Sequence, residues 1–218
     1  MRRLIQQVFG LLACSVALIA CEQSAGAVIR FDSDAARRQF EAYVAFIEHD
    51  PARYSSERAT VRQLEQSGIE YRIRVGGDFR PDVDGTLSTD GSCVVVAVSD
   101  GTGSNGKGAA PCSRFSERAC LAHELEHARQ FDSRELSFTR DVRSGRWVPD
   151  PSSYDIGDEV NAWSAQLDVA TGQDFWRRTE GSPAIGPSLL AIFAAQQSDA
   201  ARASLLQRSG YGHLAPTR

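Results

Sequence analysis

The segment that decides the fold is ACLAHELEHARQF, residues 119–131, which places His123 and His127 four residues apart. Side chains four positions apart lie on the same face of an α-helix, with Cβ atoms about 5–6 Å apart. Apolar residues recur around them at helical spacing and give the helix a side that faces a core. The spacing predicts an amphipathic helix over residues 116–131 whose two imidazoles bind one metal ion.

Glu124 completes the pattern H-E-x-x-H. It is rotated by about 100° from His123 around the predicted helix, so it can act beside the ion without being one of its ligands. Zinc lowers the pKa of a bound water to about 7, and a glutamate placed in this way can accept its proton. The pattern therefore indicates zinc as the metal and Glu124 as a general base. The competing interpretation is a solvated charged face, because Glu126 and Arg129 are also charged.

A catalytic zinc ion usually has three protein ligands and one water. The segment after the motif, ARQFD at residues 128–132, lacks the glycine and third histidine of metzincins, which excludes that class. The acidic candidates lie on a second predicted helix over residues 155–171, which Gly172 ends. They are Glu159, Asp158, Asp155 and Asp168. Helix capping is the competing role, most of all for Asp155.

The two predicted helices together resemble those of a small gluzincin-type zinc metallopeptidase. In that family a Glu-x-x-Ala helix supplies the third ligand, which the resemblance assigns to Glu159, with Ala162 as the small residue. The segment LAHELEHA at residues 121–128 is similar to the metal helix of zinc proteases among bacterial type III effectors, which follows a helical pair and two strands. The likeness covers roughly residues 35–170, and only the two metal helices are specific. Glu126 departs from the small or neutral residue often found there.

The N-terminus has the features of an export signal and also departs from that of an injected effector. A short basic start precedes an apolar stretch over residues 8–20, which is too short to span a membrane as a helix. It ends in LIAC, residues 18–21, which resembles the bacterial lipoprotein box and implies lipidation of Cys21. We expect a signal peptide over residues 1–20, a tether over 21–33 and one domain over 34–212. The alternative is an ordinary signal peptide with Cys21 incidental.

Composition limits the partners and the compartment. The formal net charge is -4, so nucleic acid is not an expected partner. Outside the leader the chain has three cysteines, which is an odd number. One disulfide and one free thiol is the expected division outside the cytoplasm. We expect Cys93 to pair with Cys112 and Cys120 to be a small buried apolar residue.

Two further features have weaker chemical meaning. The segment GTGSNGK at residues 101–107 matches a phosphate-binding loop, but Gly108 stands where Ser or Thr is required, so a connecting loop is the better interpretation. A residue that stabilises a developing oxyanion is also expected near the metal. The candidates are Tyr154, Tyr211 and His213, and each also has an ordinary packing or surface role as an alternative.

The remaining pattern predicts an α+β fold, dominated by helices, with a small sheet before the metal helix. We expect helices over 34–48, 51–66 and 187–208, strands over 69–75 and 93–98, and a hairpin over 136–148. Residues 76–92 are expected to form a turn-rich loop. With the motif, this predicts a zincin-like fold.

These observations lead to one functional expectation. We expect a zinc-dependent peptidase, an endopeptidase rather than an exopeptidase, anchored in the bacterial envelope through Cys21. It is expected to act on peptides or proteins on the outer-membrane or periplasmic side. The alternative is a non-catalytic envelope lipoprotein whose zinc site only connects two helices, and a structural site of that kind is closed by a fourth protein ligand. The oligomeric state has no signal in the sequence.

Overall fold

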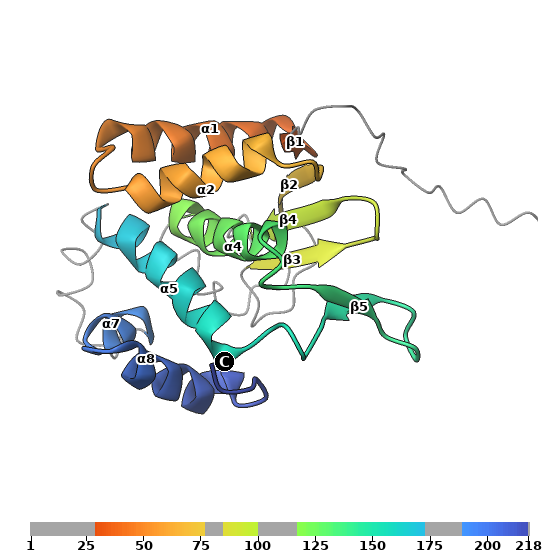
Figure 1. The fold of residues 1–218 in the computed structure, drawn as a ribbon. Helices are drawn as coiled ribbons and strands as arrows, with labels where there is room; N and C mark the ends of the chain where they lie inside the picture. The colour runs from red at the N-terminus through yellow and green to blue at the C-terminus, as the bar shows by residue number, and fades with distance from the viewer. Residues whose placement is uncertain (1–28, 77–84, 100–116, 173–188, 218) are drawn as a thin grey trace, which may run out of the picture.

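The computed structural model describes residues 29–76, 85–99, 117–172 and 189–217. A four-stranded sheet lies beside a group of helices, and helix α4 (Glu117–Asp132) runs through the middle (Figure 1). The described chain is therefore α+β with helices dominant, as the sequence predicts. The leader, Cys21, Cys112 and the segment 101–107 lie outside the described residues.

The sheet has the strand order β1-β2-β4-β3. Strands β1 (Ile29–Phe31), β2 (Tyr71–Val75) and β4 (Val94–Val98) are parallel, and β3 (Gly85–Thr89) runs antiparallel to β4 at the edge. The inner strand β4 reads VVVAV and is mostly buried, which fits a strand covered on both faces. The predicted strands over 69–75 and 93–98 are thus confirmed, with slightly shorter bounds.

The sequence pattern does not predict two of the strands, β3 and β1. The segment 85–89, GTLST, was expected to be loop, because it is short and polar and lacks the β-branched apolar run of a core strand. It becomes a strand by pairing with β4 over five residues. Strand β1 lies within residues 21–33, which were expected to be a tether, and pairs with β2 over three residues. Both strands depend on partners that are distant in the sequence.

Helices α1 (Asp34–His49) and α2 (Ser55–Gln66) lie above the sheet and α4 in Figure 1. Ser33 caps α1 by accepting a hydrogen bond from the Ala36 amide at 3.1 Å, and the helix buries Phe40, Tyr43 and Ile47. Helix α2 begins later than expected. The segment 51–54 is a turn, and residue Tyr54 is the N-cap.

Helix α4 is buried on almost every side, because it contacts the sheet, α1, α2 and α5 (Ile156–Thr171). Small residues allow these close approaches: Ala119, Ala122, Ala128 and Ala162 are at most 2% exposed. Helix α4 ends near Asp132, whose carboxylate accepts hydrogen bonds from Gln63 at 2.9 Å, from Tyr71 at 3.1 Å and from Ser67. The metal helix of the sequence is therefore a core helix with polar anchors at its end.

The segment between α4 and α5 contains a two-stranded hairpin. Strand β5 (Phe138–Arg140) pairs antiparallel with β6 (Trp147–Pro149), which confirms the hairpin predicted from the sequence. Gly145 in its turn has φ 67°, a left-handed conformation that glycine adopts without a steric penalty.

The final segment differs from the single long helix predicted over residues 187–208. It consists of α7 (Leu189–Ala194), α8 (Asp199–Leu206) and a π-helical turn η1 (Gln207–Tyr211). Ser198 is extended, and its hydroxyl accepts a hydrogen bond from the Ala201 amide at 3.2 Å, so a new helix begins there. The chain then returns to α5, where the Ala215 carbonyl accepts a hydrogen bond from the Ile156 amide at 3.0 Å.

One expectation about the cysteines is wrong, and the expected pairing of Cys93 with Cys112 stays a prediction, because Cys112 lies outside the described residues. Cys93 and Cys120 are both disulfide-bonded and almost fully buried. Cys120 is therefore a half-cystine, whereas a free buried thiol was expected. Its position three residues before His123 did not reveal this, because cysteine pairing is decided by proximity in space.

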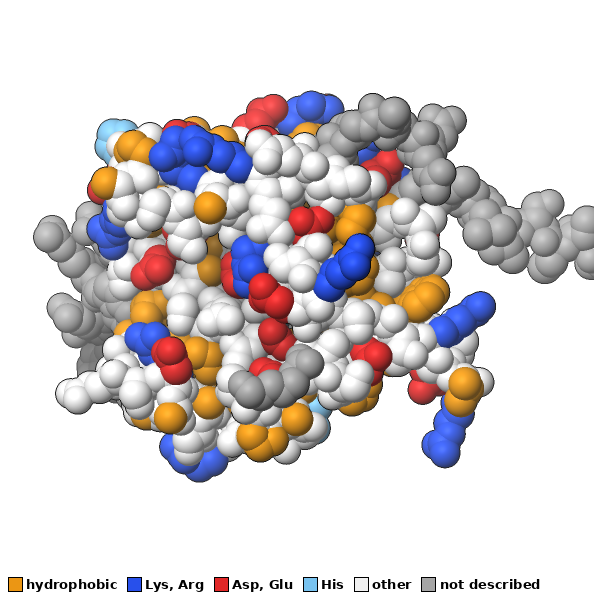
Figure 2. All heavy atoms as spheres, in the orientation of Figure 1, with side chains coloured by type: hydrophobic (Ala, Val, Ile, Leu, Met, Phe, Trp, Pro, Cys, Tyr) orange, Lys and Arg blue, Asp and Glu red, His pale blue; other side chains and the backbone are white. Residues whose placement is uncertain are grey.

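The exposed side chains and the length of the helices bear on what surrounds the protein. On the face shown in Figure 2, acidic and basic side chains are intermingled, and hydrophobic side chains occur in small groups. In the part of the chain that the structure describes, none of the helices combines the length and the apolar character required to span a membrane.

Candidate metal centre

Helix α4 presents its two histidines on the side that faces α5, as their spacing predicts. Both side chains are largely buried, and their rings lie edge to face with centroids 4.9 Å apart. The Trp163 ring from α5 packs edge to face with His123 at 6.0 Å, and the Tyr154 ring does the same with His127 at 5.9 Å. Aromatic side chains thus limit the rotation of both imidazoles.

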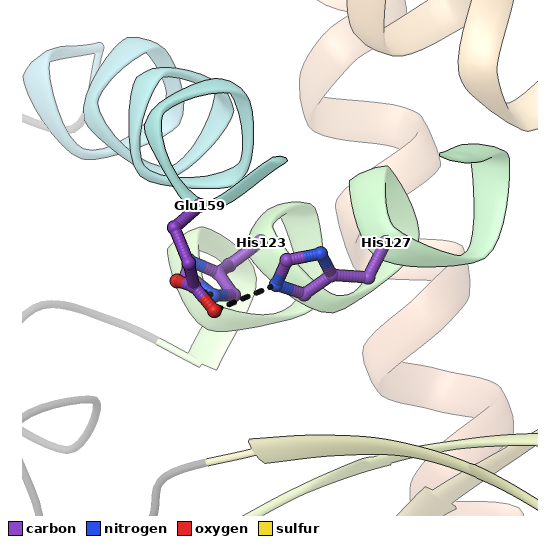
Figure 3. A group of neighbouring side chains, drawn as sticks. All are labelled: His123, His127 and Glu159. Atoms are coloured by element: carbon purple, nitrogen blue, oxygen red, sulfur yellow. Dashed lines mark ion pairs between the residues drawn. The ribbon is translucent and has the colours of Figure 1, made fainter. Parts of the chain in front are cut away.

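Helix α5 delivers the carboxylate of Glu159, which points between the two imidazoles (Figure 3). Its Oε2 lies 3.7 Å from His123 Nε2, and its Oε1 lies 3.6 Å from His127 Nε2. One nitrogen or oxygen from each of the three side chains falls within 4.8 Å of the others, so this group could hold a metal ion. It is the only such group of three or more in the described parts of the chain.

The start of α5 explains why Glu159 is free for this role and its acidic neighbours are not. Asp155 is the N-cap and accepts a hydrogen bond from the Gly157 amide at 2.7 Å. Asp158 completes a capping box by accepting from the Asp155 amide at 2.8 Å. Asp168 lies more than two helical turns further along and is not part of the metal-binding group. Among the acidic candidates named from the sequence, the structure brings Glu159 alone to the histidines.

The dimensions of the group fit a tetrahedral ion. Metal–ligand distances of about 2.0–2.1 Å place the ligand atoms of a tetrahedral site about 3.3–3.4 Å apart. The two nitrogen–oxygen distances above, each to a different oxygen of Glu159, exceed this by a few tenths of an ångström, and one ligand atom from each residue lies within 4.8 Å of the others, so small side-chain movements would bring three ligand atoms onto one ion. Glu159 Oε2 is also buried without a hydrogen-bond partner, and such an atom is costly unless a cation or donor compensates it. Two imidazole nitrogens and one carboxylate oxygen are a donor set that zinc accepts.

Burial and charge set the protonation of the group. Burial and the neighbouring charge of His127 lower the pKa of His123 to about 4. Burial would also lower the pKa of His127, but the Glu159 carboxylate outweighs it and raises that pKa. Burial would raise the pKa of Glu159, and the interaction with His127 outweighs this and lowers it. The directions of these two shifts place the proton on His127 and leave the Glu159 carboxylate ionised, and a bound cation would take the place of that proton.

Glu124 lies beside the metal-binding group, and the backbone of strand β3 packs directly on it. The Glu124 side chain is 6% exposed, and its charge contributes to the raised pKa of His127. Gly85 of β3 lies directly against this side chain, because a Cβ at position 85 would lie 2.7 Å from Glu124 Cδ. The edge strand therefore fixes the position of the carboxylate that the sequence indicates as a general base.

The three candidates for oxyanion stabilisation fall in different places. Tyr154 donates its hydroxyl hydrogen to Glu159 Oε1, and burial together with the Glu159 charge raises the pKa of Tyr154. The Tyr211 hydroxyl accepts a hydrogen bond from Trp163 Nε1 at 3.3 Å, and burial raises its pKa. Both tyrosines are therefore neutral donors near the group. His213 is exposed on the C-terminal segment.

Sequence reasoning missed two residues that shape this centre, Gly85 and Gln130. Gly85 belongs to a segment expected to be loop. Gln130 is fully buried, and its Oε1 lies 2.8 Å from His127 Nδ1. Its place on the helix was a usable signal, since residues 123, 127 and 130 follow a spacing of four and three and share one face.

Comparisons of the chain with protein-family models, with curated proteins and with solved structures gave no match. The functional conclusion therefore depends on the chemistry of the residues in the centre itself.

Proposed function

We propose that this protein is a zinc-dependent peptidase of the bacterial envelope, with a zincin-like fold of the gluzincin type. The observation that carries the proposal is the group His123, His127 and Glu159 with Glu124 beside it. Within the described residues the group has three members and no fourth His, Cys, Asp or Glu. Three protein ligands leave a tetrahedral ion one position for water, which is typical of catalytic zinc sites, whereas structural sites have four protein ligands.

The residues divide the chemistry as follows. Zinc, when bound by the three ligands, supplies a Lewis acid that polarises a carbonyl and makes a water acidic at neutral pH. Glu124 removes a proton from the attacking water and later donates it to the leaving amine. Tyr211 keeps its proton and offers a hydroxyl donor to the developing negative charge, whereas the Tyr154 hydroxyl donates to Glu159 Oε1 and orients that carboxylate. Burial around Glu124 strengthens each of these interactions, because less water screens them.

The position of strand β3 supports an extended peptide as the substrate. In the described sheet β3 is an edge strand, and its first residue, Gly85, contacts Glu124. A peptide that adds to a sheet edge is held by main-chain hydrogen bonds, which do not depend on where its termini lie. This favours an endopeptidase that acts on unfolded protein segments. Attachment to the envelope through Cys21 belongs to the same proposal and depends on the resemblance to the lipoprotein box.

The proposal is tested by Glu124→Gln, which removes the base at nearly constant volume. General-base catalysis contributes about 10²–10⁴-fold, so hydrolysis of casein should fall by at least about 100-fold while one zinc per chain is retained. Metal content is measured by elemental analysis of the same preparations. Equal hydrolysis by Glu124→Gln and wild type would instead favour the non-catalytic alternative, in which the ion only connects α4 and α5.

A further inference from the structure

Gln130 connects the two helices of the metal centre through one amide group. It lies on α4, three residues after His127, and is 0% exposed. Its Oε1 is 2.8 Å from His127 Nδ1, and its Nε2 donates a hydrogen bond to the Asp158 carbonyl at 3.0 Å. Asp158 directly precedes Glu159 on α5, so the amide spans from one metal ligand to the backbone beside another.

The chemistry of the amide decides the protonation of His127. A backbone carbonyl can only accept hydrogen bonds, so the NH₂ group of Gln130 must face Asp158. The oxygen of the amide then faces His127 and can only accept, which requires a hydrogen on Nδ1. In the neutral imidazole the lone pair is consequently on Nε2, the nitrogen that faces Glu159 at 3.6 Å. The backbone of α5 thus selects the tautomer of a histidine on α4.

The two histidines differ in this respect. His123 Nδ1 is buried and has no hydrogen-bond partner. Packing against Trp163 and the nearby Gln166 side chain orient the His123 ring, whereas His127 has an aromatic neighbour and the hydrogen bond from its Nδ1 to Gln130. Partners of this kind orient metal-bound histidines and raise their basicity, and their loss typically costs about 10–100-fold in metal affinity.

We propose that Gln130 is a positioning residue of the metal centre, which sets the tautomer of His127 and holds that histidine in register with Glu159. The inference rests on the proposed function, because it assumes that the group binds zinc. It goes beyond that function by assigning a role to a residue that is neither a ligand nor a base, and by making the α4–α5 connection part of the affinity for the ion.

The test uses zinc affinity, measured on the full chain by competition with a chromogenic chelator at pH 7.5. Gln130→Met removes both hydrogen bonds at similar volume and should weaken zinc binding about 10–100-fold. The matched control is Gln63→Met, since Gln63 also bonds to the end of α4, to Asp132 and Ser133, each at 2.9 Å, away from the ligands. The control should be destabilised, yet bind zinc as wild type does.

A second measurement needs no variant, so it applies even if Gln130→Met does not fold. In zinc-loaded wild type labelled with ¹⁵N-histidine, the imidazole nitrogen shifts should show His127 bound through Nε2 with hydrogen on Nδ1. Binding through Nδ1 would overturn the inference, and so would unchanged zinc affinity in a folded Gln130→Met protein or an equal loss in Gln63→Met. Failure of the wild type to bind zinc is a different result, which would overturn the proposed function itself.

Discussion

Gly85 and Glu124 are in such close contact that position 85 cannot carry a side chain unless the Glu124 carboxylate or strand β3 moves. A Cβ there would lie 2.7 Å from both Cγ and Cδ of Glu124, well inside van der Waals contact. A shift of the edge strand β3 would therefore also shift the proposed catalytic base, Glu124. The position of the base depends on a strand that is far from the metal helix in the sequence.

We predict that Gly85→Ala lowers peptidase activity without loss of zinc. The added methyl group must displace either β3 or the Glu124 side chain, and a displacement of about 1 Å from the reacting atoms can cost about 100-fold in rate. The measurement is casein hydrolysis together with zinc content. Gly68→Ala is the control, because a Cβ at position 68 meets nothing within 4 Å. Full activity in Gly85→Ala would show that the base tolerates this displacement.

Substitutions of two neighbouring acidic residues on α5 should distinguish metal binding from helix capping. Glu159→Ala should lose zinc and activity together, because it removes one of three ligands. Asp158→Ala removes half of a capping box and should cost about 0.5–2 kcal/mol of stability while zinc is retained. Metal analysis and urea unfolding measure the two effects. Loss of zinc in Asp158→Ala with retention in Glu159→Ala would contradict the assignment of the third ligand.

Zinc should raise the thermal stability of the protein. An ion that binds the folded state alone, present at about 1,000 times its Kd, adds about 4 kcal/mol, which is on the order of 10 °C in Tm for a chain of this size. The measurement is thermal unfolding in a chelator and after zinc is restored. His123→Ala should show no such difference. The same Tm in chelator and in zinc for wild type would contradict metal binding at this centre.

Glu57 should make stability depend on pH away from the metal centre. Burial, and then the charges of Asp168 and Glu126, raise its pKa from 4.5 to about 7. Neither of its carboxylate oxygens has a hydrogen-bond partner. The folded state therefore binds a proton more tightly than the unfolded state, so stability falls as pH rises between about 4.5 and about 7 and stays lower above that range.

Glu57→Gln should remove this dependence, because glutamine does not titrate. At pH 8 the variant should be more stable than wild type by up to about 3 kcal/mol, and near pH 4.5 the two should be equal. Urea unfolding across this range in the presence of a chelator measures the difference. Glu65→Gln, an exposed position on the same helix, should follow wild type at every pH. A Glu57→Gln protein less stable than wild type at pH 8 would reverse the sign of the prediction.

Lipidation should depend on a single residue of the leader. The segment LIAC at residues 18–21 implies that Cys21 carries the lipid. Metabolic labelling with a palmitate analogue should mark wild type and leave Cys21→Ser unmarked, and the wild type should fractionate with membranes. A soluble, unlabelled wild type would favour an ordinary signal peptide.

The sequence by itself determined the elements whose signals are local. The positions of His123 and His127 on one helical face follow from 3.6 residues per turn, and the cap at Asp155 follows from the side chain's own reach to the next amides. The sequence also predicted β4, because a strand buried on both faces is a continuous run of apolar residues. Only the resemblance to gluzincins favoured Glu159 as the third metal ligand, and the residues themselves left its acidic neighbours as alternatives.

Only the tertiary structure decided what depends on contacts between distant segments. Strand β3 is polar and short, so it forms only because β4 offers it a hydrogen-bonding edge, and this pairing places Gly85 on Glu124. The break at Ser198 replaces one expected helix with two, because a hydroxyl cap competes with continuation of the helix. The sequence places Gln130 on the same helical face as the two histidines, but only α5 brings the Asp158 carbonyl beside its amide group. Helix α4 was determined by its own periodicity, whereas the orientation of its side chains required neighbours that no local pattern specifies.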